Sequence, residues 1–307
     1  MKDDRSAAEA RRGGLRPALS RSGVDLAGYR RKDDAWLAAA WADPRTRVLV
    51  VAEGHALVAG SPPGLMLVEP AAAPEGERIL LGVDGEGVAY FSVHAPLPVV
   101  EGGAPGDLRR YGALLSDRDA GLLTQAAALD AWHAGNRFCP RCGGPTRLAA
   151  AGHVRICERE GIEHFPRTDP AVIMLVHDGD RCLLAHNPRW PDERRVSVLA
   201  GFVEAGESAE QAVVREVAEE VGVAVQRPEF LGSQPWPFPR SLMLGFTARA
   251  TGRAERTDFE EITQVYWFTR AELREAVDAD RIRLPGSVSI ARKLIEHWYG
   301  GELPGEW

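Results

Sequence analysis

Three glutamates that lie close together, Glu216, Glu219 and Glu220, are the residues in this sequence best suited to chemistry. They end a longer pattern over residues 201–223: Gly, five residues, Glu, seven residues, then Arg-Glu-apolar-x-Glu-Glu-x-Gly-apolar. Clustered carboxylates are hard ligands that suit Mg²⁺ or Mn²⁺, and such ions keep waters and bridge to phosphate oxygens. The pattern therefore predicts metal-assisted chemistry on a phosphorylated substrate.

A helix over about 208–221 is predicted to carry these glutamates. Ser208 and Gln211 match a capping box, and a glycine follows the expected end. At about 100° per residue, Glu220 falls within an apolar stripe and Glu216 beside it. A glutamate-rich helix usually presents a solvated face, but like charges one turn apart at a core edge need a counter-ion. A bound metal explains them better than solvent does. The stripe consists of Ala209, Val213, Val217 and Val221.

The composition of the chain sets the broad class of protein. Its 307 residues are enough for two domains, and a formal net charge of −7 gives no sign of a broad nucleic-acid-binding surface. No stretch approaches the roughly 20 apolar residues of a membrane span. The N-terminus leads into no apolar segment of the kind found in secretion signals. We expect a cytoplasmic protein that does not associate with membranes.

Four parts are expected along the chain. Residues 1–20 are charged and predict a disordered tail. Residues 21–130 predict an α+β domain, with strands near 47–52, 78–83 and 88–93 and helices near 34–41 and 107–132. Residues 131–168 contain a cysteine motif. The last part, 169–300, predicts a mixed sheet flanked by helices, with strands near 171–176, 181–185, 196–200, 229–232, 242–248 and 265–268 and further helices near 269–278 and 289–299.

The cysteine motif predicts a zinc ribbon with an unusual ligand set. Cys139 and Cys142 form a Cys-x-x-Cys turn, and Cys157 follows fifteen residues later. A four-cysteine ribbon would place its last ligand at position 160, which holds a glutamate. We expect a structural zinc; the alternative is a ribbon in which zinc is weakly held or lost. The candidates for the fourth ligand are Glu160, His164 and His153.

A proline-rich stretch, residues 233–243, follows the glutamate pattern. Its three prolines alternate with Gln, Trp and Phe in the order Ser-Gln-Pro-Trp-Pro-Phe-Pro-Arg-Ser-Leu-Met. Proline cannot donate to a strand ladder, so a regular central strand is excluded here. We expect a stiff loop that loses little entropy when its aromatic groups bind a ligand.

With these motifs in place, the sequence resembles the Nudix hydrolases. Residues 201–223 fill every fixed position of the Nudix box, and the motif SQPWPFPxS at 233–241 is similar to the signature of the NADH pyrophosphatase branch. The Phe-Cys-x-x-Cys-Gly opening at 138–143 agrees with that branch. The resemblance is strong over 132–299 and loose before it. It implies a Nudix α/β/α sandwich, a homodimer, and cleavage of NAD(H) into NMN(H) and AMP, extending to the same linkage in the NAD cap of RNA 5′ ends.

The resemblance also implies roles for particular residues. Two or three Mg²⁺ or Mn²⁺ ions would be held by Glu216, Glu219, Glu220, Glu261 and the carbonyl of Ala200. The three box glutamates would be catalytic, with Glu219 or Glu220 as the base. Phe165, at a position usually held by tyrosine, and Phe202 would stack on substrate. A glutamate that contacts substrate in some members is replaced by Gly152. The remaining substrate contacts implied are Gln234, Pro235, Trp236, Pro237, Phe238, Pro239, Arg240, Ser241 and Ala291.

Two other functions compete with this interpretation. The first is a Nudix hydrolase of ADP-ribose or another dinucleotide, which the proline-rich motif disfavours. The second is a regulator that binds a nucleotide without cleaving it. Such a regulator would tolerate loss of the glutamates, whereas all of them are present here, and no helix-turn-helix is evident.

Overall fold

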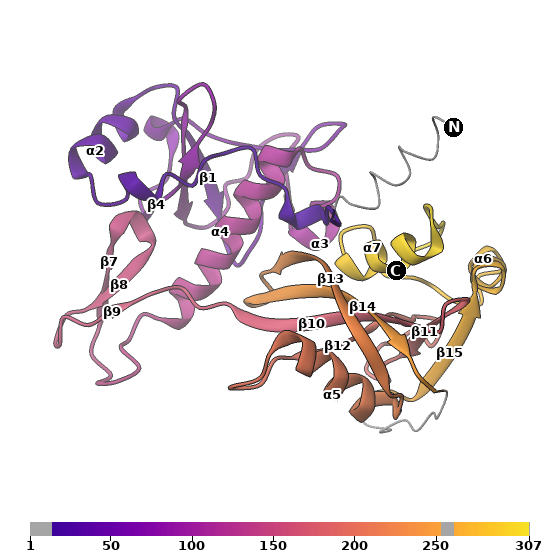
Figure 1. The fold of residues 1–307 in the computed structure, drawn as a ribbon. Coiled ribbons are helices and arrows are strands. Elements are labelled where there is room, and N and C mark those ends of the chain that lie inside the picture. The colour runs from indigo at the N-terminus through magenta and orange to yellow at the C-terminus, as the bar shows by residue number, and fades with distance from the viewer. Residues whose placement is uncertain (1–13, 253–260, 307) are drawn as a thin grey trace, which may run out of the picture. The chain divides into compact units, whose positions relative to one another are not determined.

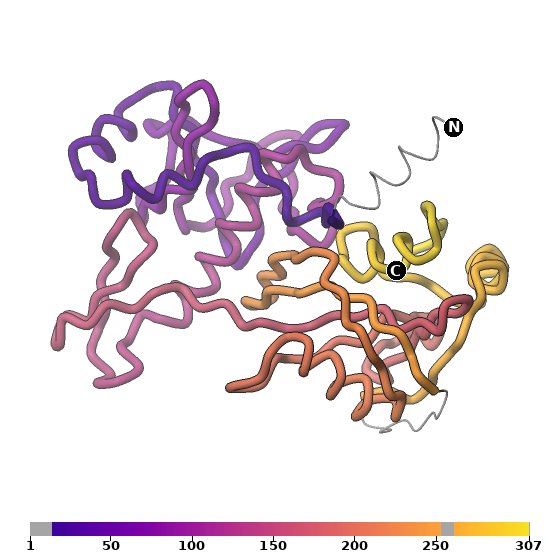
Figure 2. Tube along the Cα trace, in the orientation of Figure 1, coloured from indigo at the N-terminus to yellow at the C-terminus, as the bar shows by residue number. Residues whose placement is uncertain are grey.

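The computed structural model describes residues 14–252 and 261–306 (Figure 1). Most of the predicted tail therefore lies outside the described residues; the tube in Figure 2 shows the undescribed parts in grey. The chain forms two compact units. One contains Asp169–Gln234 and Leu242–Trp307 together with the described residues up to Ala18, and the other contains Leu19–Thr168 and Pro235–Ser241.

The unit that carries the glutamates is built on a six-stranded sheet. The strand order is β13-β14-β10-β11-β15, and β12 pairs with β10. The pairings of β10 with β11, β10 with β12 and β11 with β15 are antiparallel. Its elements are β10 (Asp169–His177), β11 (Arg181–His186), β12 (Leu199–Phe202), α5 (Ala209–Val221), β13 (Val225–Trp236), β14 (Ser241–Ala250), β15 (Gln264–Thr269), α6 (Arg270–Asp278) and α7 (Ile290–Tyr299).

Strand β10 divides the core of this unit into two layers. Its alternate residues Val172 and Met174 pack with the buried side of α5, while Ile173 and Leu175 pack with α6 and α7. Side chains of a strand alternate between the faces of a sheet, so a run of apolar residues requires cover on both. The predicted α/β/α sandwich is confirmed.

Helix α5 begins and ends where its capping residues require. The Ser208 hydroxyl accepts a hydrogen bond from the Gln211 N–H at 3.2 Å, and the Gln211 side chain accepts one from the Ser208 N–H at 2.9 Å. At the other end Gly222 adopts φ 66°, a left-handed conformation that glycine reaches without a steric penalty. Helix α6 has the same kind of capping box, formed by Thr269 and Glu272.

The proline-rich stretch differs from the expected loop. Strand β13 extends through Pro235 to Trp236, and β14 begins at Ser241, so only four residues connect the two strands. The prediction of a loop was wrong because it excluded only a central strand, in which proline would interrupt the hydrogen bonds on both sides. Strand β13 is the outermost strand of the sheet, where one side of the backbone needs no ladder partner and proline is tolerated.

The second unit contains three small sheets, with strand orders β1-β5-β4, β3-β2-β6 and β7-β8-β9. Strands β1 and β5 are parallel, and β4 and β5 are antiparallel. The expected helix near 107–132 is interrupted at Gly112. The elements are α2 (Asp34–Ala42), β1 (Arg47–Val51), β2 (Ala56–Ala59), β3 (Gly64–Leu65), β4 (Arg78–Val83), β5 (Ala89–His94), β6 (Ala104–Gly106), α3 (Leu108–Tyr111), α4 (Asp117–Gly135), β7 (Thr146–Ala149), β8 (Val154–Cys157) and β9 (Glu163–His164).

Within the described ranges, 14–252 and 261–306, no helix has the length and apolar character needed to cross a bilayer.

Candidate active site

The three box glutamates project from α5 with graded exposure. Glu220 is 5% exposed, whereas the side chain of Glu216 is 13% exposed and that of Glu219 is 61% exposed. Positions three and four apart are neighbours on a helix, so the carboxylates run together from the core edge towards solvent. This grading suits a cation that keeps part of its water shell.

Arg215 joins these carboxylates to the loop that precedes the helix. Its guanidinium donates two hydrogen bonds of 2.8 Å to the Glu207 carboxylate. It also donates to Glu216 at 2.8 Å, to Glu219 at 3.0 Å and to the carbonyl of Phe202 at 2.9 Å. The fork geometry of arginine permits all of these bonds at once. Arg215 therefore fixes two of the three box glutamates relative to strand β12.

Gly201 is required by the close approach of strand β12 to α5. A Cβ atom built on Gly201 would overlap the carboxylate of Glu216. Strand β12 pairs with β10 so that Gly201 lies opposite Val172. The absent side chain thus makes the space in which the Glu216 carboxylate lies, beside Ala200.

The electrostatics of the site favour a bound cation. Burial raises the pKa of Glu216, and the charges of Glu219 and Glu261 raise it further, against the lowering effect of Arg215. Glu261 therefore lies within electrostatic range of Glu216. In contrast, the hydrogen bonds from Arg215 lower the pKa of Glu207 to about 2. A divalent cation would relieve the repulsion at Glu216, and the all-carboxylate donor set fits Mg²⁺ or Mn²⁺.

The predicted stacking residues are exposed aromatic side chains. Phe202, one residue after Gly201, is 60% exposed, and Phe165 in the other unit is 51% exposed. The face of an exposed aromatic ring can stack on another planar group. Both are thus available to a planar ligand.

The aromatic residues of the proline-rich stretch contact an arginine that the sequence did not single out. The Arg109 guanidinium lies 4.0 Å from the centroid of the Phe238 ring and 5.5 Å from that of the Trp236 ring. The two rings meet edge to face at 5.0 Å. Arg109 lies in the short helix α3 (Leu108–Tyr111), about 130 residues before the loop, and belongs to no recognisable motif. The sequence therefore gives no sign that Arg109 and the loop meet. Only the folded chain reveals the pair.

Three of the implied substrate contacts, Gln234, Pro237 and Ala291, are buried in the structure. Gln234 is 0% exposed, and its side-chain amide donates to the Val288 carbonyl at 3.1 Å. Ala291 is 2% exposed in the first turn of α7, where its N–H donates to the Ser289 hydroxyl. Pro237 is also buried, whereas Pro239 and Arg240 are exposed and Pro235, Trp236, Phe238 and Ser241 are half-buried.

Gly152, at the position of a substrate-contacting glutamate in some relatives, has a structural reason to be glycine. It is buried with φ +88°, and a Cβ there would clash with the Ile79 side chain. The neighbouring His153 ring lies 2.8 Å from the Leu80 carbonyl. A glutamate would not fit without separating the ribbon from β4, so that substrate contact is absent from this chain.

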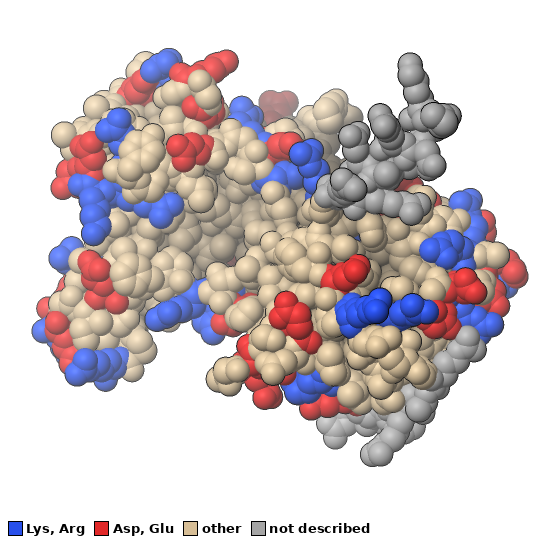
Figure 3. Space-filling model, viewed as in Figure 1, with Lys and Arg blue, Asp and Glu red and all other residues tan. Residues whose placement is uncertain are grey.

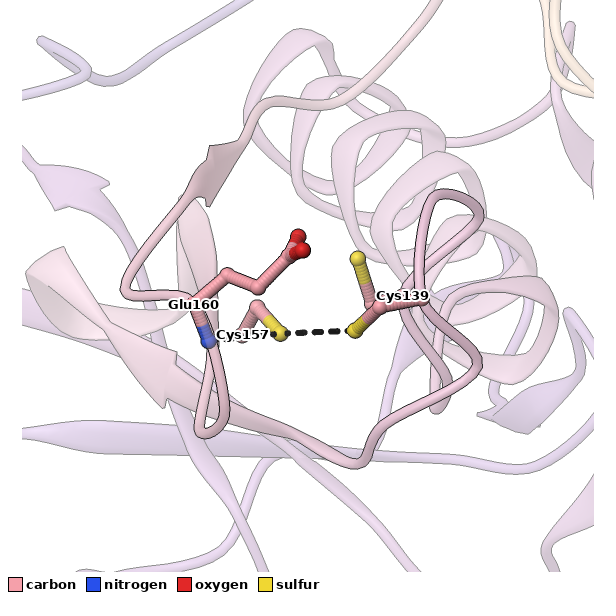
Figure 4. Close-up of side chains that lie close together, drawn as sticks. Cys139, Cys157 and Glu160 are labelled. Carbon is pink, nitrogen blue, oxygen red and sulfur yellow. Dashed lines mark hydrogen bonds between the residues drawn. The ribbon is translucent and has the colours of Figure 1, made fainter.

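The ribbon brings together three cysteines and one of the candidate fourth ligands. Cys139, Cys142, Cys157 and Glu160 each offer one ligand atom, and these atoms lie within 4.8 Å of one another. Figure 4 shows the Glu160 side chain extending towards the same space as the sulfur atoms. Three thiolates and a carboxylate are suitable zinc ligands.

Three family models match the chain. They are the NUDIX domain over residues 167–285, the NADH pyrophosphatase zinc ribbon domain over 135–165 and the NADH pyrophosphatase-like rudimentary NUDIX domain over 34–132. The chain is 44% identical over 303 residues to the NAD-capped RNA hydrolase NudC of Mycobacterium bovis, which covers 92% of this chain and 94% of that protein. NudC of Mycobacterium tuberculosis gives the same values. Human NAD-capped RNA hydrolase NUDT12 is 40% identical over 222 residues, or 68% of this chain and 45% of NUDT12.

The box helix on its sheet defines a Nudix hydrolase. The similarity to NudC extends through the ribbon and the N-terminal domain, well beyond that one domain. The chain belongs to the NADH pyrophosphatase family of Nudix hydrolases.

Proposed function

We propose that this protein hydrolyses the pyrophosphate bond of NAD(H) to give NMN(H) and AMP, and that it removes the NAD cap from RNA 5′ ends by the same chemistry. The observation that carries the proposal is the intact carboxylate set on α5, with Arg215 holding Glu216 and Glu219 in place. The names of the relatives support NAD-capped RNA as a substrate. On the face drawn in Figure 3, basic and acidic residues are interspersed, so we expect recognition to depend mainly on the cap.

The residues of the site have separate roles in the proposed reaction. When bound, Mg²⁺ or Mn²⁺ would neutralise the anionic oxygens of the pyrophosphate and activate a water. Glu216, Glu219, Glu220 and Glu261 would hold two or three such ions, together with the Ala200 carbonyl. Either Glu219 or Glu220 would accept the proton of the attacking water.

The exposed aromatic residues would stack on the planar rings of the substrate. Phe202 and Phe165 offer exposed rings for stacking, and stacking at a fixed position reduces the entropy lost in reaching the reactive geometry. The half-buried Trp236 and Phe238 are held by contact with Arg109. Arg109 also brings a positive charge to this loop, which favours an anionic substrate.

We also propose that the ribbon binds a structural Zn²⁺, that the protein is cytoplasmic and that it forms a homodimer. The matching zinc ribbon model and the cysteine cluster support the zinc. The location follows from the substrate, because NAD(H) and capped transcripts are intracellular molecules. Light scattering coupled to gel filtration would test the dimer: a mass of one chain, 33.4 kDa, would refute it.

The products formed from NADH provide the direct test. The purified protein is incubated with NADH or NAD-capped RNA in the presence of Mg²⁺ or Mn²⁺. NMNH and AMP support the proposal, whereas nicotinamide and ADP-ribose refute it. Glu220→Gln should fold normally and lose most activity, while Glu210→Gln, an exposed glutamate on the same helix, should retain it. Near-normal turnover by Glu220→Gln with saturating Mg²⁺ would contradict the metal assignment.

A further inference from the structure

One of the four candidate zinc ligands in the ribbon, Glu160, differs from the three cysteines in chemistry and exposure. Cys139 and Cys157 are 2% and 1% exposed, whereas the Glu160 side chain is 34% exposed. The Cys142 and Cys157 sulfur atoms are 3.5 Å apart. Three thiolates thus form a largely buried base, and the carboxylate stands at the solvent side.

The backbone around each pair of ligands forms the tight turn that a metal-binding knuckle needs. In the first turn, the Gly143 N–H donates to the Cys139 carbonyl at 2.9 Å, and the Gly144 N–H lies 3.4 Å from the Cys142 sulfur. In the second turn, the Gly161 N–H donates to the Cys157 carbonyl at 2.8 Å, and the Glu160 N–H lies 3.4 Å from the Cys157 sulfur. Both turns are therefore closed by the same backbone hydrogen bond from residue i+4 to residue i, although their N–H to sulfur contacts differ. Glu160 occupies in the second turn the sequence position that Cys142 occupies in the first.

The alternative fourth ligands lie outside this cluster. The His164 Nε2 atom is buried and has no hydrogen-bond partner among the described residues, but the His164 ring contributes no atom to the cluster. The His153 ring bonds to the Leu80 carbonyl. Glu160 alone of the three belongs to the cluster within 4.8 Å.

We propose that Glu160 is an exchangeable fourth zinc ligand, which makes the ribbon a reversible zinc site. The proposal deepens the structural zinc of the proposed function and rests on it. Carboxylate oxygen is a harder ligand than thiolate and binds zinc less selectively. Because the Glu160 side chain is partly exposed, water can reach the fourth coordination position of the zinc. The Nε atom of Arg141 lies 3.8 Å from the Glu160 carboxylate, so Arg141 offers this carboxylate an alternative partner. Zinc occupancy should then follow the free zinc concentration.

Cysteine substitutions test the ligand assignment in the full-length protein. The wild type, Glu160→Cys and the matched control His164→Cys are loaded with Co²⁺, and the thiolate-to-cobalt charge-transfer absorption is measured per bound metal. A fourth thiolate should increase this absorption by about one third in Glu160→Cys only. Zinc release to a chromophoric chelator should be slower in Glu160→Cys than in the wild type, and faster in Glu160→Ala by about tenfold or more.

Several results would overturn the inference. They are an unchanged cobalt spectrum in Glu160→Cys, a fourth-thiolate spectrum in His164→Cys, equal zinc release from the wild type and Glu160→Cys, or a wild type that binds neither Co²⁺ nor Zn²⁺ in a titration. Because Glu160→Ala and Glu160→Cys change the ligand in opposite ways, misfolding of one leaves the other informative. NADH turnover is measured separately, so a failure of the proposed hydrolysis would appear without any change in metal content.

Discussion

Gly201→Ala should separate the positioning of the metal-binding carboxylates from the stability of the fold. The added methyl group would overlap the Glu216 carboxylate. Ordinary contacts of a Cβ begin at 3.4 Å, so the carboxylate must retreat by on the order of 1 Å. A displacement of that size in a catalytic group costs about 100-fold in rate. Gly201 does not have a positive φ, so the alanine backbone itself is not strained.

Steady-state hydrolysis of NADH over a range of Mg²⁺ concentrations measures this effect. We expect kcat to fall about 100-fold and the Mg²⁺ requirement to rise, while the thermal unfolding of the metal-free protein changes little. Gly301→Ala is the matched control, because nothing lies within 4 Å of its added methyl group. Wild-type kcat and Mg²⁺ dependence in Gly201→Ala would refute the argument that this glycine makes space for Glu216.

Three other changes test separate parts of the site. Ser208→Ala removes the cap of α5 and should lower the free energy of unfolding by about 1 kcal/mol in urea denaturation, whereas Ser208→Thr should retain most of it. The Glu207 pKa is lowered from 4.5 to about 2, so its contribution to stability should be complete above pH 4.5 and lost as the pH falls towards 2. Denaturation in EDTA should show that Glu207→Gln lacks this loss. Arg109→Ala should raise the KM for NADH about two- to fivefold through loss of the contact with Phe238, and an unchanged KM would argue against that role.

The helix and its glutamates were the most predictable part of the molecule, because local rules determine them. The capping pair at Ser208 and Gln211, the final glycine and the 3.6-residue period all act within one turn or two. The same period located Glu220 in the core stripe, where it is 5% exposed. These are properties of neighbouring residues, so the sequence contains all that is needed.

The features that the sequence did not reveal depend on contacts between distant segments. Gly152 is glycine because Ile79 occupies the space beside it, and Arg109 meets Phe238 although 129 positions separate them in the chain. The set of strands predicted for the N-terminal domain was also incomplete, since the short strands β2, β3 and β6 have too few residues to show a period. The rudimentary NUDIX character of that domain likewise left no box motif to find.

The prolines near the end of strand β13 have a second consequence, which concerns behaviour at high protein concentration. An outermost strand normally exposes a row of N–H and C=O groups that can pair with the strand of another molecule. Pro228 and Pro235 lie within β13, and Pro237 and Pro239 follow it directly. Pro228 and Pro235 each lack the backbone N–H that another residue would contribute to the strand. The prolines within this strand thus make its edge a poorer template for β-pairing with another molecule.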